Sequence, residues 1–247
     1  MTDSLREVAP GVHRFADGLV NWYLVVTDDG LTLFDTGWPR SWPRISAALH
    51  GLGHEPKDVS AIVLTHGHPD HMGGAHDAHE HCDAPVYVRD AEAGRVAGEA
   101  KGASPFALVP SLLPVLWRPA SFGFVMHATL RGFLTPTWVK DVRTFSAEPL
   151  DVPGRPRPLA TPGHTEGHTS FELPDHGVLI AGDALLTMSP LTREEGPQRP
   201  PARLNVDNDD VEASLDVLAA VDAELILTGH GDPWKGTPAQ AVKRARG

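Results

Sequence analysis

One heptapeptide, Thr65–His71, constrains the fold more than any other part of the chain. It reads Thr-His-Gly-His-Pro-Asp-His, which places three histidines and an acid directly after the short apolar run Ala61–Leu64, a predicted buried strand. On an extended backbone His66 and His68 project to the same side, and Pro69 favours the extended form at His68. The two imidazoles can then bind one metal ion.

Asp70 and His71 lie beyond the proline, where the chain bends, so they face a neighbouring position. Gly73 and Gly74 leave the backbone free to turn into the next helix. The spacing differs from the helical zinc-protease signature, in which two histidines four residues apart share one helix face. The segment predicts a loop that supplies ligands for two adjacent metal ions. The alternative is a solvated, histidine-rich loop.

Three later segments share one pattern, in which a short apolar strand ends in a small-residue turn that presents a polar side chain. These side chains are His164 after Pro-Gly, Asp183 after Ala-Gly and His230 after Thr-Gly. Parallel strands bring such ends to one edge of a sheet, where open α/β sheets have their binding sites. We therefore expect all three side chains to meet the Thr65–His71 segment at this edge.

The side chains collected in this way suffice for two metal ions. Neutral imidazole and carboxylate groups suit zinc, and also iron or manganese; zinc is the ion that we expect. The predicted ligands are His66, His68 and His164 for one ion, Asp70, His71 and His230 for the other, and Asp183 as a bridge between them.

Short apolar runs and helical patterns follow one another along the chain, which predicts a layered α/β or α+β domain. The 24 glycines and 23 prolines are scattered as turn signals, and this favours many short elements. From about residue 91 to 142 the pattern is helical and broken by prolines. Expected strands are 12–15, 22–26, 31–34, 61–64, 86–88, one near 159, 169–173, 178–181 and 225–227; expected helices are 41–52, 74–81, 209–221 and 238–246.

Composition narrows the class of partner. The 247 residues are enough for one sizeable domain, and 21 basic against 32 acidic residues give a formal net charge of −11. This balance argues against a nucleic-acid partner, because phosphate binding requires clustered lysine and arginine. No secretory signal is visible at the N-terminus, and the longest apolar stretch is too short to cross a bilayer. We expect a cytoplasmic protein that acts on a small molecule, without a membrane partner.

The motifs resemble those of the metallo-β-lactamase superfamily and occur in the same order. The resemblance covers about Val12 to Trp234 and implies one domain over residues 1–247, with a four-layer αββα sandwich and a dinuclear metal site along one edge. It also implies that Asp35 lies beneath the metal loop as a hydrogen-bond acceptor, and we expect His168 to support the ligands or the nearby structure. The motifs are Phe34-Asp35-Thr36-Gly37, Thr65–His71, Pro162-Gly163-His164-Thr165, Gly182-Asp183 and Gly229-His230-Gly231.

Within the superfamily the chain looks most like the glyoxalase II and lactonase-like branch. This resemblance implies hydrolysis of a small acyl substrate: a thioester, a lactone or a carboxylic ester. Hydroxide held by the two ions would attack the acyl carbon, while Asp70 would accept a hydrogen bond from it and later pass a proton to the leaving group. The helical insertion at about 91–142 is expected to cover the site, with its aromatic side chains forming an acyl pocket or packing in the core.

Other functions stay open at this point. True β-lactamases lack a bridging aspartate at the position of Asp183, so the name of the superfamily does not define the substrate. Persulfide dioxygenases resemble this chain in the same motifs, yet they bind a single iron and consume oxygen. Phosphodiester hydrolysis is a further alternative, and so is a metal-binding scaffold without catalysis.

Overall fold

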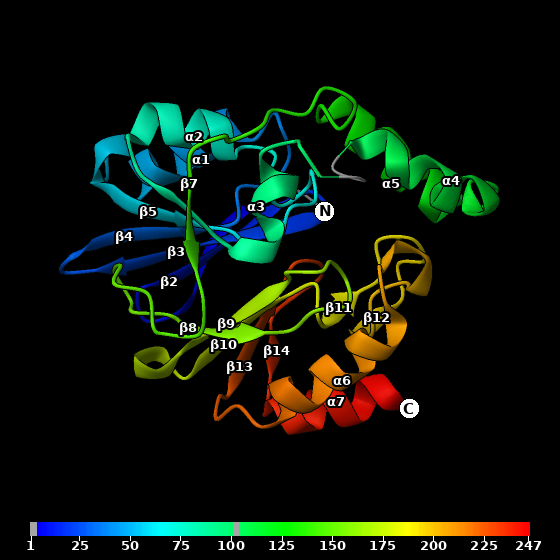
Figure 1. Cartoon of the computed structure of the whole chain (residues 1–247). Helices are drawn as coiled ribbons and strands as arrows, with labels where there is room; N and C mark the ends of the chain where they lie inside the picture. Colours follow the sequence, from blue (N-terminus) through cyan, green and yellow to red (C-terminus); the bar gives the residue numbers. More distant parts are fainter. Residues whose placement is uncertain (1–3, 101–103) are drawn as a thin grey trace.

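Two β-sheets pack face to face, with helices on both outer sides, in the computed structural model of the chain (Figure 1). The structure describes residues 4–100 and 104–247. The first sheet has seven strands in the order of the sequence: β1 (Ser4–Ala9), β2 (Val12–Asp17), β3 (Val20–Thr27), β4 (Gly30–Phe34), β5 (Val59–Val63), β6 (Val86–Arg89) and β7 (Val142–Phe145).

The second sheet has five strands, and a separate two-stranded ribbon lies beside it. The order in the sheet is β14 (Trp234–Lys235), β13 (Leu225–Thr228), β10 (Val178–Gly182), β9 (Thr169–Leu173) and β8 (Arg157–Ala160). The ribbon pairs β11 (Leu186–Met188) with β12 (Glu195–Gln198).

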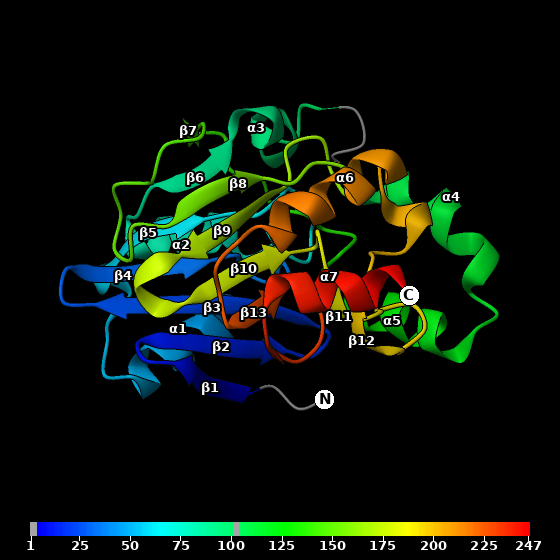
Figure 2. The same ribbon diagram turned by 90° about the horizontal axis from the view of Figure 1, so that it is seen from below.

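Helices cover the outer face of each sheet. Figure 1 shows α1 (Trp42–Gly51) and α2 (Ala75–Cys82) over the first sheet, and Figure 2 shows α6 (Asn208–Ala219) and α7 (Pro238–Arg246) over the second. The remaining helices are α3 (Asp90–Val96), α4 (Val109–Leu112) and α5 (Pro119–Leu130). The short 3-10 turns are Pro56–Asp58, Pro105–Leu108, Leu113–Val115, Pro174–His176 and Ala202–Leu204.

The central strands are apolar on both faces because both faces are buried. Side chains alternate across a strand, so Ile62 of β5 packs in the core beneath α1 and α2, while Val63 packs between the two sheets. Likewise, Leu179 of β10 packs beneath α6 and α7, while Ile180 lies between the sheets. This pattern explains why the central strands read as continuous apolar runs rather than as alternating ones.

Strand direction positions the functional residues. β4, β5 and β6 are parallel neighbours in the first sheet, and β10 and β13 are parallel neighbours in the second. The carboxyl ends of β5, β10 and β13 lead directly into the segments that contain His66, Asp183 and His230. Because the carboxyl ends of parallel strands lie at the same edge, these three polar side chains lie at one edge of the two sheets.

The predicted fold class is confirmed, as a mixed α/β sandwich. Several elements differ from the sequence interpretation: β1, β11, β12 and β14 were not expected. The insertion was expected to be helical to residue 142, but a loop follows α5 and β7 begins at Val142. Short strands such as the two-residue β14 leave too little periodic pattern to be recognised. Among the described residues, no helix has the length and apolarity that a bilayer crossing requires.

Asp17, at the end of β2, joins the first sheet to two helical segments. Its side chain is fully buried, and its carboxylate accepts hydrogen bonds from Arg44 Nε of α1 at 2.7 Å and from Arg131 Nη1 after α5 at 2.6 Å. The Ser41 hydroxyl also donates to it. The carboxylate thus compensates two cations whose side chains are only 24% and 19% exposed.

We predict that Asp17→Ala lowers the free energy of unfolding by about 3 kcal/mol, because it leaves two partly buried guanidinium groups without their carboxylate. Urea unfolding followed by circular dichroism measures the change. Asp28→Ala, in an exposed turn, is the control and should shift stability by less than about 0.5 kcal/mol. Equal stability of both variants would contradict the assigned role of Asp17.

Candidate metal centre

Seven side chains from four separate segments converge at the edge between the sheets. They form three overlapping groups, and within each group the potential ligand atoms lie within 4.8 Å of one another. The groups are His66, His68 and His164; His66, His71 and Asp183; and Asp70, His71 and His230. The structure thus brings together every residue that the sequence analysis proposed as a metal ligand.

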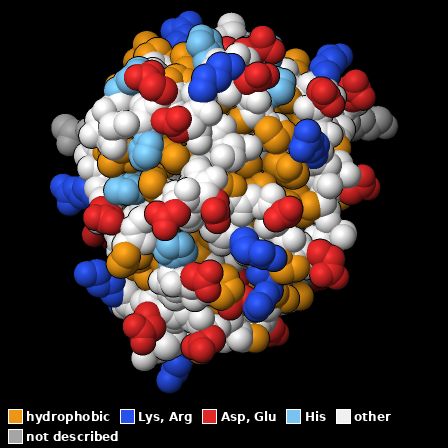
Figure 3. All heavy atoms as spheres, turned by 90° about the vertical axis from the view of Figure 1, so that its left-hand side faces the viewer, with side chains coloured by type: hydrophobic (Ala, Val, Ile, Leu, Met, Phe, Trp, Pro, Cys, Tyr) orange, Lys and Arg blue, Asp and Glu red, His pale blue; other side chains and the backbone are white. Residues whose placement is uncertain are grey.

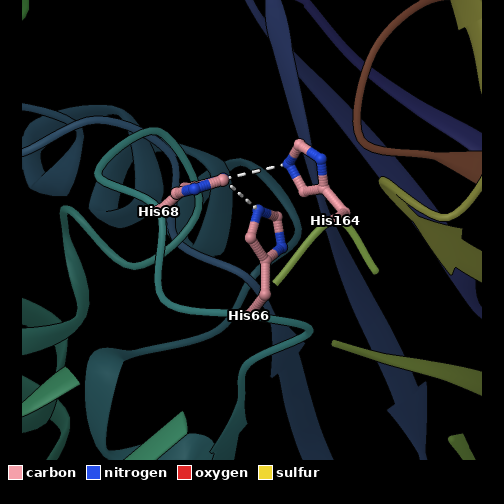
Figure 4. A group of neighbouring side chains, drawn as sticks. All are labelled: His66, His68 and His164. Carbon is pink, nitrogen blue, oxygen red and sulfur yellow. Dashed lines mark hydrogen bonds between the residues drawn. The ribbon is translucent and has the colours of Figure 1, made fainter. Parts of the chain in front are cut away.

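The first group consists of three imidazoles that point at a common centre (Figure 4). His68 Nδ1 lies 3.0 Å from His66 Nε2 and 3.0 Å from His164 Nε2. His66 and His68 come from the loop after β5, whereas His164 comes from the turn between β8 and β9 of the other sheet. Two nitrogen ligands about 2.1 Å from one tetrahedral zinc ion are separated by about 3.4 Å, close to the 3.0 Å seen here. The spacing therefore suits a shared cation.

Asp183 links the first group to the second group, which consists of Asp70, His71 and His230. Its Oδ2 lies 3.4 Å from His164 Nε2 and 3.3 Å from His230 Nε2, and its Oδ1 lies 3.5 Å from His71 Nε2. Asp70 Oδ2 approaches His230 Nε2 at 3.5 Å. One carboxylate thus faces ligand atoms of both groups, as a bridge between two ions requires.

Asp35 fixes the loop that carries the histidines. Its Oδ1 accepts the backbone N–H of Thr65 at 2.8 Å, and its Oδ2 accepts the Thr65 hydroxyl and His71 Nδ1, each at 2.8 Å. Because a carboxylate can only accept, His71 donates from Nδ1, and its Nε2 faces Asp183. The Thr65 hydroxyl, having donated to Asp35, accepts from His66 Nδ1 at 3.0 Å. Asp35 therefore orients two ligand residues.

His164 and His230 are oriented by oxygen acceptors in the same manner. His164 Nδ1 lies 2.9 Å from Asn205 Oδ1, and the amide nitrogen of Asn205 donates to Asn208 Oδ1, which fixes the orientation of the amide. His230 Nδ1 donates to the carbonyl oxygen of Leu19. Each imidazole thus keeps its proton on Nδ1 and presents the Nε2 lone pair to the centre, an arrangement that orients metal ligands.

Within the part of the chain that the structure describes, buried nitrogen and oxygen atoms at the centre of the site lack hydrogen-bond partners in a way that fits metal ions. His71 Nε2 and Asp183 Oδ1 are buried side-chain atoms without a hydrogen-bond partner among the described residues, and they face each other. In the first group, Nε2 of His66 and Nε2 of His164 both face Nδ1 of His68, and a single proton on Nδ1 could be donated to only one of them. A cation satisfies all of these atoms, whereas a water molecule cannot donate to so many acceptors.

The electrostatics also favour cation binding. Burial and the neighbouring histidines lower the pKa of His66 and His68 well below 6.5, so both imidazoles stay neutral. Burial lowers the pKa of His71, but the carboxylates of Asp183, Asp35 and Asp70 outweigh it and raise the pKa to about 10. The second group thus attracts positive charge, and a bound ion would replace the proton on His71.

His168 supports the bridging aspartate from behind. Its Nε2 accepts the backbone N–H of Asp183 at 2.9 Å, and its Nδ1 lies 2.9 Å from the Thr161 hydroxyl. Burial lowers the pKa of His168 to about 3, which keeps Nε2 available as an acceptor. The structure therefore places His168 beside the ligands as a hydrogen-bonding partner of the Asp183 backbone.

Glu92 of α3 is a supporting residue that the sequence analysis missed. It is fully buried, and its two carboxylate oxygens accept the backbone N–H groups of Gly67 and Gly167, both at 2.8 Å. Gly67 lies between His66 and His68, and Gly167 follows His164, so Glu92 ties together the two loops that form the three-histidine group. A Cβ at either glycine would meet side-chain atoms of α3 at about 2.8 Å, which shows how closely the helix contacts both loops.

An apolar cavity opens directly onto the candidate ligands. It contains about 490 Å³ of empty space, part of it open to solvent, and its polar lining consists of five of the seven candidate ligands. Six aromatic residues are expected to form an acyl pocket or pack in the core. Of these, Phe124 and Phe133 line this cavity, and Trp138 packs against the core between the first sheet and helices α1 and α2. Phe106, Trp117 and Phe122 are instead exposed.

We predict that Glu92→Ala weakens zinc binding to the three-histidine group about 10- to 100-fold, because the two loops lose their common acceptor. Competition with a chromophoric chelator measures the affinity of each of the two ions separately. Glu80→Ala, on the exposed face of α2, serves as the control. Two zinc ions bound with unchanged affinity by Glu92→Ala would show that Glu92 does not position the ligands.

Comparison with known proteins agrees with this architecture. The model of the metallo-beta-lactamase superfamily matches residues 16–230. The probable metallo-hydrolase YflN of Bacillus subtilis is 32% identical over 93% of this chain and 87% of its own length. The probable metallo-hydrolase Rv2300c of Mycobacterium tuberculosis is 33% identical over 74% of this chain and 67% of its own length.

Solved structures show the same fold. The metallo-beta-lactamase family protein TTHA1429 of Thermus thermophilus superposes with a TM-score of 0.66 at 27% identity, over 96% of this chain and 79% of that protein. The Rm3 metallo-beta-lactamase superposes with a TM-score of 0.70 at 19% identity, over 99% of this chain and 91% of its own, which is a likeness of fold alone. The chain belongs to the metallo-beta-lactamase superfamily.

Proposed function

We propose that this protein is a dinuclear metal-dependent hydrolase of small, uncharged acyl substrates, similar to the glyoxalase II and lactonase-like branch. The substrate is a carboxylic ester, a lactone or a thioester, and the two ions are zinc. The observation that carries the proposal is the position of Asp183, whose carboxylate faces ligand atoms of both groups at 3.3–3.5 Å. The names of the relatives, probable metallo-hydrolases, are consistent with it.

The lining of the cavity supports an uncharged substrate. Apart from candidate ligands, the described residues that line it are leucine, phenylalanine and proline, and no lysine or arginine is among them. A phosphodiester or a substrate that depends on a carboxylate anchor would meet no cationic side chain there, so its desolvation would be poorly compensated. An uncharged acyl group has no charge to desolvate, so it needs no cationic side chain in the cavity.

A nucleic-acid partner is also disfavoured. The net charge of −11 repels a polyanion. On the face seen in Figure 3, acidic side chains lie among the basic ones. The proposed partner is therefore a small molecule that enters the cavity.

The mechanism uses the geometry of the second group. Two divalent ions held by these residues would supply Lewis acidity, which lowers the pKa of bound water and stabilises an oxyanion at an attacked carbonyl. Asp70 lines the cavity and contacts His230, so its carboxylate can accept a proton at the cavity floor and return it to the leaving group. The buried histidines hold their tautomers, and no side-chain nucleophile is required.

The metal requirement is tested by removal and reconstitution. Chelator-treated protein should lose hydrolysis of p-nitrophenyl esters, lactones or thioesters, and two equivalents of zinc per chain should restore it. Asp183→Asn should reduce the bound zinc toward one equivalent, measured by elemental analysis after dialysis. One iron per chain combined with oxygen consumption would instead indicate an oxygenase, and activity on phosphodiesters alone would indicate a different hydrolase.

Asp70→Asn should lower kcat about 10²- to 10⁴-fold, because an amide cannot transfer the proton. The three-histidine group does not include Asp70, so one zinc ion should remain tightly bound. Steady-state kinetics with zinc analysis of the same sample separates the two effects. Wild-type kcat in this variant would remove Asp70 from the mechanism.

A further inference from the structure

A second cavity lies behind the first, within the insertion. It contains about 440 Å³ of empty space, part of it open to solvent, and is formed between α4, the turn Leu113–Val115 and α5. Figures 1 and 2 both show α4 and α5 at the end of the molecule where β11 and β12 lie. Nine of its ten lining residues are apolar. The tenth is Thr129, whose hydroxyl donates to the carbonyl oxygen of Val125 and so offers no free donor.

The two cavities share a wall. Leu112, Phe124 and Phe133 line both of them, and these side chains are only 6–8% exposed. The wall therefore consists of one aliphatic and two aromatic side chains, without a hydrogen bond or an ion pair across it. Displacement of a side chain in this wall would break no polar contact.

We propose that the second cavity binds the distal part of a linear acyl chain whose carbonyl group lies at the metal centre. This inference rests on the proposed function and adds the substrate class: acyl compounds with medium-length alkyl chains. The cavity suits an alkyl chain because its lining, over the described residues, carries no charge and no free polar group. It adjoins the catalytic cavity at the shared wall, so a ligand that displaces a side chain of this wall can occupy both.

The expected signature is a dependence on chain length. Each methylene that moves from water into the cavity should raise kcat/KM by roughly threefold, so octanoyl esters should exceed acetyl esters by at least about 100-fold. Val125→Phe places a larger ring in the cavity, away from the shared wall. It should reduce the octanoyl-to-acetyl ratio of kcat/KM by tenfold or more. The substrates are p-nitrophenyl esters of acetate, butyrate, hexanoate and octanoate.

A matched pair of leucines provides the control. Leu113 lies at the rim of the cavity and is 60% exposed, whereas Leu130 is 69% exposed on α5 and does not line it. Leu113→Asp places a charge in the lining of the second cavity and should reduce the octanoyl-to-acetyl ratio about tenfold, whereas Leu130→Asp should leave the ratio unchanged. Both positions are exposed, so neither substitution should prevent folding.

A binding measurement separates this inference from the proposed function. Calorimetric titration of the zinc-loaded protein with octanoate, with acetate as the reference, reports the cavity even if no ester is hydrolysed. Tighter binding of octanoate that is lost in Val125→Phe supports the acyl cavity independently of catalysis. A ratio and an octanoate affinity that are unchanged in both Val125→Phe and Leu113→Asp, with both variants folded, would overturn the inference.

Discussion

Nitrogen lone pairs that face one another across 3.0 Å are repulsive unless a positive charge lies among them. Nε2 of His66 and Nε2 of His164 are both held 3.0 Å from Nδ1 of His68, and in both rings Nδ1 is bound to an oxygen acceptor, so both Nε2 lone pairs face inward. All three side chains are buried, at 0–8% exposure. The local structure is thus arranged for a cation, and binding of that cation contributes to the stability of the loops that surround it.

The site also lies on the seam between the two sheets. His66 and His68 belong to the first sheet's loop, and His164 belongs to the second, so a bound ion joins the two halves of the molecule. Backbone contacts reinforce this junction: the Thr169 N–H donates to the carbonyl oxygen of Thr65 at 2.9 Å, and Glu92 connects both loops from a third element. The same residues that create the candidate chemistry therefore contribute to cohesion of the fold.

Much of this could be predicted because the ligand pattern is local. The spacing of residues within Thr65–His71 is enough to predict where its side chains project. Each later candidate ligand follows an apolar strand, and parallel strands bring the ends of these strands together. Glu92 carries no such pattern. Its contacts lie 25 and 75 residues away in the chain, and an acid on a short helix ordinarily faces solvent. Asn205 is similar, because its role depends on a contact 41 residues distant.

The aromatic residues of the insertion show a second limit of prediction from the sequence: which of them are buried. Phe124 and Phe122 lie two positions apart on one helix, yet one lines the cavity and the other is 55% exposed. The hydrophobic pattern of α5 is nearly uniform, so periodicity does not reveal which side faces the sheets. Only packing against Trp38, whose ring centroid lies 6.0 Å from that of Phe124, decides the orientation.

None of the seven candidate ligands lies between residues 104 and 134, although this segment contributes the wall that borders both cavities. It is attached to the sandwich by a few polar contacts, among them Arg131 to Asp17 and the Ser121 hydroxyl to the carbonyl oxygen of Leu191. In the proposed enzyme, the residues of the reaction centre and those that would select the substrate therefore lie in separate stretches of the polypeptide. Divergence of the segment can change which molecules are admitted while the inherited reaction centre stays intact.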